Sequence, residues 1–172
     1  MSLLRSLFLR FAFAGLSIAA APAFAAVPSD NVQVLGAVKT PMTLKVEDLE
    51  AFPADQISTA TLTRLVDNKD VSSTVRGVKL SALLERAQLQ TTSRHDWKHM
   101  AVIASADDGY RVVFSWPELS NTEIGAGVLV IFERDGQALS DEEGRIALVS
   151  ARDTNTGPRH VKWLSHIEIK LL

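Results

Sequence analysis

Three cationic side chains lie within four positions near the end of the chain. Arg159, His160 and Lys162 follow Gly157 in an irregular segment. A guanidinium offers two parallel donors to a phosphate or carboxylate, and an ammonium adds a point charge beside it. The spacing predicts an anion-binding cluster, and the alternative is a solvated basic edge before a terminal strand. For His160 the solvated edge is the favoured interpretation.

Two further arginines flank the strand expected over Ile146 to Val149, which leads into the same segment. Arg145 and Arg152 can therefore join the cluster, although Asp153 can also pair with one of them. A surface ion pair of that kind contributes little stability. Trp163 is expected in the core rather than as a stacking platform, although both can hold at the edge of a cleft.

The sequence gives little support for a metal site or for a catalytic motif. His95 and His99 would face the same way on a helix, but the polar stretch around them favours no helix and supplies no third ligand. No metal site is predicted. Neither a nucleophile-elbow motif nor a glycine-rich phosphate loop is present, and no catalytic residue is predicted.

The N-terminus reads as a secretory signal peptide over residues 1–25. Arg5 and Arg10 precede an apolar stretch, and Ala23-Phe24-Ala25 is a small-x-small cleavage site. The two arginines are not adjacent, so the signal is of the general secretory type rather than twin-arginine. We expect a periplasmic protein without a membrane anchor after cleavage, in which residues 26–172 form a single domain.

The amino-acid composition argues against one class of partner and indicates how the protein is stabilised. The 172-residue chain has 20 Asp and Glu against 18 Lys and Arg, which argues against a nucleic-acid partner. It contains no cysteine, so an exported protein of this sequence must be stabilised by its hydrophobic core rather than by disulfides.

The elements expected around these residues are mostly strands. A helix is expected over Leu44 to Phe52, ended by Pro53, and another over Leu80 to Ala87, where apolar residues share one face. Alternating or β-branched runs predict the strands, which are Val32 to Val38, Ile57 to Val66, Val71 to Val78, Met100 to Ala106, Tyr110 to Phe114, Val128 to Phe132, Ile146 to Val149 and Ser165 to Leu171. The fold class is α+β, a mostly β mixed-sheet domain with short helices.

Several segments in this order resemble the oxidoreductase molybdopterin-binding domain of the sulfite oxidase superfamily. They are Leu35 to Pro41, Arg76 to Leu84, Asp108 to Tyr110, Asp135 to Leu139, Gly144 to Val149 and Thr156 to Leu164. The resemblance implies that domain's fold and a molybdopterin cofactor, with Arg159 and Lys162 at positions that contact the phosphate of the pterin.

The same resemblance implies a cysteine thiolate on the molybdenum, between the Thr-rich strand and the helix at Leu80. Here that interval is Leu65 to Val71 and contains no cysteine. An oxygen ligand from Asp67 is a poor substitute for a soft thiolate, and an Asp-Asn pair is typical of a turn. A general secretory signal also threads an unfolded chain, which does not suit a preloaded cofactor.

Three functions follow as hypotheses. The first is a molybdopterin-dependent oxidoreductase, or a subunit of one, that lacks the usual cysteine. The second, which we favour, is a non-catalytic protein that binds a small anionic ligand or a periplasmic partner protein in the former cofactor pocket. The third is an interaction domain with a filled pocket.

Overall fold

The computed structural model describes residues 30–93 and 95–172. The predicted signal peptide over residues 1–25 lies outside the described residues. The described helices, including the 3-10 helices η1 to η3, are α1 (Val46–Glu50), α2 (Leu80–Ala87), η1 (Asp96–His99), α3 (Trp116–Asn121), η2 (Gly125–Gly127) and η3 (Gly157–Arg159). No helix in the described part of the chain is long and apolar enough to cross a membrane.

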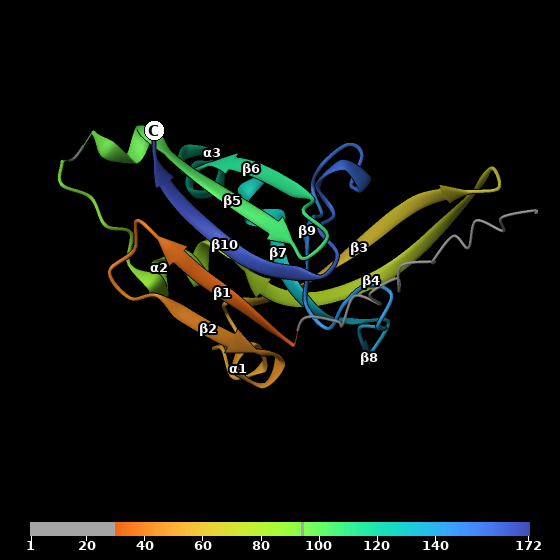
Figure 1. Ribbon diagram of the computed structural model, residues 1–172. Coiled ribbons are helices and arrows are strands. Elements are labelled where there is room, and N and C mark those ends of the chain that lie inside the picture. The colour runs from red at the N-terminus through yellow and green to blue at the C-terminus, as the bar shows by residue number, and fades with distance from the viewer. Residues whose placement is uncertain (1–29, 94) are drawn as a thin grey trace, which may run out of the picture.

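Two mixed or antiparallel sheets make up most of the domain (Figure 1). The first has the strand order β2-β1-β10-β5-β6, in which β1 and β10 pair in parallel. Its strands are β1 (Asn31–Gly36), β2 (Met42–Lys45), β5 (Met100–Ala106), β6 (Arg111–Ser115) and β10 (Leu164–Leu171). The second has the order β3-β4-β7-β8, and β9 also pairs with β7. Its strands are β3 (Ile57–Val66), β4 (Lys69–Lys79), β7 (Val128–Arg134), β8 (Gln137–Ala138) and β9 (Ala147–Ser150).

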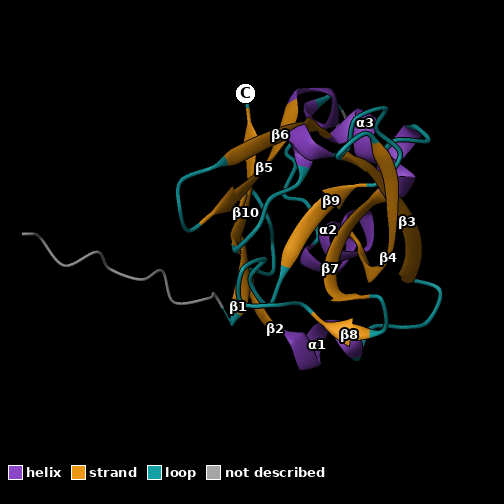
Figure 2. Ribbon diagram, turned by 90° about the vertical axis from the view of Figure 1, so that its right-hand side faces the viewer, coloured by secondary structure: helices purple, strands orange, loops and turns teal. Residues whose placement is uncertain are grey.

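The main core lies between the sheets and includes the apolar face of α2 (Figure 2). Strand β7 contributes to two apolar clusters, because successive side chains of a strand point to opposite faces of the sheet. Val128, Val130 and Phe132 enter the main core. Leu129 and Ile131 enter a second, smaller apolar cluster on the opposite face of the same sheet.

The strands and the helix over Leu80 to Ala87 appear where the sequence predicts them. The helix predicted over Leu44 to Phe52 is shorter than expected. Residues Met42–Lys45 form β2 instead, because Leu44 is buried by its antiparallel pairing with Val32. Helix α3 was not predicted, although its signal is present: the Ser115 hydroxyl accepts a hydrogen bond from the Glu118 amide at 3.1 Å, an N-cap.

The β3–β4 hairpin extends well beyond the rest of its sheet (Figure 1). Strand β4 pairs with β7 over Val75 to Lys79, whereas β3 and β4 remain paired as far as Val66 and Lys69. Asp67 and Asn68 form the turn and both have a positive φ, of 50° and 59°. This matches a two-residue hairpin turn, and the interpretation of Asp67 as a turn residue is confirmed.

Candidate functional site

The segment between β9 and β10 carries the predicted cations, and it is fixed on both sides. Val161 exchanges two backbone hydrogen bonds with Leu148 of β9, at 2.8 and 2.9 Å. On the other side the Tyr110 hydroxyl donates to the Pro158 carbonyl at 2.7 Å. The cationic side chains therefore project from an ordered support rather than from a loose loop.

Arg159 is enclosed by acidic side chains. Its Nε donates to Asp153 Oδ2 at 2.6 Å and its Nη1 to Glu118 Oε1 at 2.7 Å, while Nη2 donates to Asp153 Oδ1. The guanidinium lies 4.7 Å from the centroid of the Phe114 ring. The hydrogen bond from Arg159 lowers the pKa of Asp153, and those two carboxylates raise the pKa of Arg159 against the opposing effect of burial. Arg159 is thus already neutralised from within the protein.

His160 belongs to a second ion network. Its Nε2 lies 2.8 Å from Glu143 Oε1, and Arg134 Nε donates to Glu143 Oε2 at 2.9 Å. Burial alone would raise the pKa of Glu143, but the hydrogen bonds from His160 and Arg134 outweigh it and lower the pKa from 4.5 to about 2. His160 is half-buried rather than part of a solvated edge.

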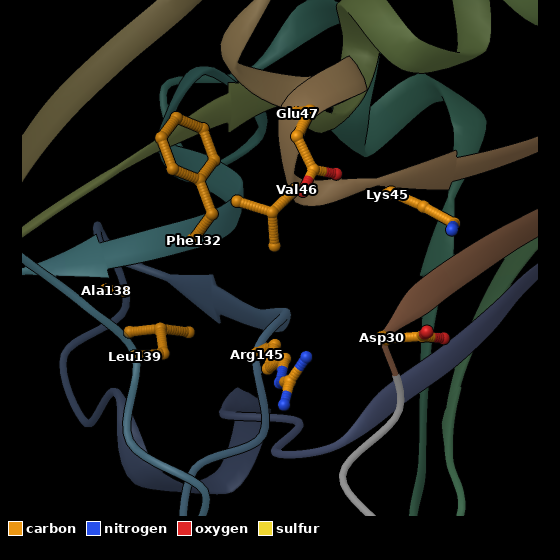
Figure 3. A pocket seen from close by; sticks show the side chains of 8 residues that line it. All are labelled: Asp30, Lys45, Val46, Glu47, Phe132, Ala138, Leu139 and Arg145. Carbon is orange, nitrogen blue, oxygen red and sulfur yellow. The ribbon is translucent and has the colours of Figure 1, made fainter.

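Arg145 and Arg152 do not join Arg159. Arg145 lines a separate cavity of about 390 Å³, where it faces Lys45 and Glu47 from the junction of β2 and α1 (Figure 3). Arg152 instead pairs with Glu123 on the surface. Asp153 pairs with Arg159 rather than with either of them, which corrects the expected pairing. A role for Arg145 and Arg152 in cofactor binding stays a prediction.

Lys162 differs from the other cations of the segment, because no described residue forms an ion pair or hydrogen bond with its side chain. It lines a cavity of about 440 Å³ whose far wall is the β3–β4 hairpin. Arg64 of β3 lines the same cavity and is likewise unpaired among the described residues. Ser73, Ser140 and Thr156 also line this cavity, and the Ser73 hydroxyl accepts a hydrogen bond from Arg134 Nη1 at 2.6 Å.

The acidic residues of this cavity are mostly engaged. Glu143 is bound by Arg134 and His160, and Asp135 Oδ1 accepts a hydrogen bond from the Thr74 amide at 2.7 Å. Glu142 is exposed on the rim. Two unpaired cations beside hydroxyl donors can hold an anion.

Arg64 was missed by the sequence reasoning. Its signal is strand parity: on an alternating strand Arg64 shares a face with Leu62, which is buried. Trp163, expected in the core, is half-buried at the wall of an adjoining cavity of about 260 Å³ that also contains Tyr110, His160 and Lys162. Its indole Nε1 donates to the Asp141 carbonyl at 2.8 Å.

His95 and His99 are exposed, and the segment at Asp96–His99 is a 3-10 helix. With about three residues per turn, positions four apart do not share a face there. Asp96 serves the local turn, since its Oδ2 accepts from the Thr92 and Ser93 amides, each at 2.7 Å. Among the described residues no group of three His, Cys, Asp or Glu side chains could hold a metal ion.

Two β-sheets around a shared core, with short helices and an ordered cationic segment between β9 and β10, place the chain in the α+β class as a mostly β domain. Residues 24–171 match the model of the oxidoreductase molybdopterin binding domain, and the chain belongs to that family. A sequence comparison with curated proteins gives no match.

Among solved structures the fold is similar to that of the sulfane dehydrogenase SoxCD from Paracoccus pantotrophus, with a TM-score of 0.64 and 20% sequence identity. The similarity covers 83% of this chain but 38% of that one, so the chain spans well under half the length of that neighbour. At this identity the likeness establishes the fold, which is the sulfite oxidase-like molybdopterin-binding fold.

The residues of this chain do not fit a molybdenum centre of the family type. The interval where the resemblance implies the thiolate is the tip of the β3–β4 hairpin, and Leu65 there is 68% exposed. The whole sequence contains no cysteine, and Asp67 occupies the turn. Arg159, one of the two positions implied to hold the pterin phosphate, is bound by Asp153 and Glu118. Of Arg159 and Lys162, only Lys162 is without an acidic partner among the described residues and can bind a ligand.

Proposed function

We propose that this chain is an exported, non-catalytic member of the family that binds a small anionic ligand in the cavity beneath the β3–β4 hairpin. The proposal rests on which of the cations already have an acidic partner. Arg64 and Lys162 face one cavity of about 440 Å³ without an acidic partner among the described residues, whereas Arg159 is already paired with Asp153 and Glu118. Placing the protein in the periplasm rests on the predicted signal peptide.

The electrostatic argument favours a ligand with one or two negative charges. Lys162 contributes a compact ammonium and Arg64 a planar guanidinium that can donate two hydrogen bonds at once. Side-chain hydroxyls on the wall supply neutral donors. Glu142 at the rim reduces the local positive charge and would disfavour highly charged anions.

Replacing Lys162 with alanine tests this site. We expect inorganic phosphate to stabilise the wild-type protein against heat, relative to chloride at equal ionic strength, and the variant to lose that response. Its apparent affinity should fall by about tenfold, the usual scale for losing one charged hydrogen bond. Glu142→Gln should instead raise the affinity, because it removes the acidic group at the rim.

Lys39→Ala is the matched control, since Lys39 is an exposed lysine outside the cavity. It should leave the phosphate response unchanged. An equal loss in both lysine variants, or none in Lys162→Ala, would show that the cavity is not the binding site. Molybdenum and pterin analysis of the protein purified from its native host addresses the alternative: stoichiometric molybdenum would establish a molybdopterin-dependent oxidoreductase and overturn the non-catalytic assignment.

A further inference from the structure

Strand β3 is an unusual sheet edge. The other edge strands of the described chain are short: β2 and β9 have four residues each, β6 has five and β8 has two. Strand β3 has ten residues, contains no proline and carries a single charge, Arg64. Natural sheets usually protect a long edge with charges, prolines or covering segments, because an open edge pairs with other strands.

Nothing in the described part of the chain covers this edge. All ten residues of β3 pair with β4 on one side. Within residues 58–66 no other backbone hydrogen bond is formed with the described chain. The outward-facing amide and carbonyl groups of residues 58–66 are therefore available to another strand, whereas the Ile57 amide already donates to the Pro53 carbonyl at 3.2 Å.

On one face of β3 the residue types are symmetric about Thr61. Thr59 and Thr63 stand two positions from Thr61 and are exposed. Ile57 and Leu65 stand four positions away; Leu65 is exposed, whereas Ile57 is half-buried against the main core. An antiparallel strand pair related by a two-fold axis through Thr61 would place each of these residues opposite its symmetric counterpart. Thr–Thr and apolar pairs directly opposite each other stabilise antiparallel strands.

We propose that the partner of β3 is a second copy of this chain, joined edge to edge in an antiparallel register centred on Thr61. The two copies would share one continuous sheet across their β3 strands. Leu65, which is 68% exposed, would gain Ile57 of the other copy as its neighbour.

The charges of the strand agree with self-pairing. In this register Arg64 lies opposite Ser58, so the one charge on β3 never meets its own copy. From Arg64 to Asp70 the end of the hairpin carries two positive side chains, Arg64 and Lys69, and two negative ones, Asp67 and Asp70, so this end has no net charge. An isologous pair also closes on itself, so both open edges are used and no further chain can add.

Single cysteines give a direct test, because the chain contains none of its own. In Thr61→Cys the two thiols would face each other across the axis. Directly opposed residues of antiparallel strands are about 4.5 to 5.5 Å apart at Cα, within the range that a disulfide spans. Mild oxidation should therefore convert Thr61→Cys to a covalent dimer, measured on a non-reducing gel.

Thr59→Cys is the matched control, since Thr59 is also exposed on the same face. Its two copies would be separated by four residues along the strands, on the order of 13 Å, and should not crosslink. Thr61→Lys, which opposes two like charges at the axis, should raise the dimer dissociation constant by at least about tenfold.

Light scattering on the wild-type protein completes the test, with a dimer mass expected at about 100 µM. A monomer mass at that concentration would overturn the proposal and leave the edge to a different partner. A dimer in which Thr59→Cys crosslinks as readily as Thr61→Cys would rule out the register. A dimer unaffected by Thr61→Lys would place the interface elsewhere.

Discussion

Replacing Arg159 with methionine is expected to destabilise the protein rather than to abolish ligand binding. The substitution would leave Asp153 and Glu118 as neighbouring carboxylates without their shared cation, with side chains that are 11% and 27% exposed. Removing one partner of a buried ion network costs about 3 to 5 kcal/mol. Because this network is partly exposed, we expect unfolding to become easier by about 3 kcal/mol, measured by urea titration at pH 7.

Arg152→Met is the matched control for that experiment. Arg152 pairs with Glu123, but their side chains are 49% and 91% exposed. An exposed ion pair contributes less than about 1 kcal/mol, so the control should be close to wild type. In the double variant Arg159→Met with Asp153→Leu, the loss should be smaller than the sum of the single losses, because the orphaned charge is removed.

The opposite result would change the assignment of the site. If Arg159→Met keeps wild-type stability and loses the response to phosphate, then Arg159 is the ligand-binding cation and its carboxylate partners are displaced on binding. We expect Lys162→Ala, by contrast, to keep wild-type stability and to lose the response to phosphate. The two substitutions therefore separate a structural cation from a binding cation in the same segment.

The regular elements were predictable because their signals are local. Strand β7 reads as a continuous apolar run, and the hairpins at Asp67 and Gly109 have turn residues with a positive φ. The helix over Leu80 to Ala87 shows a buried face at helical spacing. Strand β2 was missed because its four residues are held by pairing with β1, which is a non-local contact.

The candidate site was only partly predictable for the same reason. The sequence identifies Arg159, His160 and Lys162 as cations, but their availability depends on which acidic residues pair with them. Asp153 lies six residues from Arg159, whereas the other acidic partners are farther along the chain. Glu118 is 41 residues from Arg159, and Glu143 is 17 from His160. No local pattern marks which cation will be neutralised. Pairing, rather than charge alone, decides which side chain can serve a ligand.

Lowering the pH should show how much the ion network of Glu143, Arg134 and His160 contributes to stability. Glu143 has a pKa of about 2 in the folded protein against an ordinary value of 4.5. The unfolded chain therefore takes up a proton at Glu143 as the pH falls below about 5, whereas the folded protein does so only near pH 2. Stability from this group is fully present above the unfolded pKa and is lost as the pH falls through that window. The total is on the order of 3 kcal/mol.

Glu143→Gln isolates this contribution from those of other carboxylates. The variant should be less stable than wild type at pH 7, because Arg134 and His160 lose their charged partner. The difference should be nearly unchanged in urea titrations at pH 5 and should shrink at pH 3.5, since wild type itself loses the contribution only below the unfolded pKa of 4.5. Glu142→Gln, at the exposed neighbouring position, should match wild type in stability at each pH. A difference for Glu143→Gln that stays constant with pH would mean that the carboxylate acts through packing rather than through its charge.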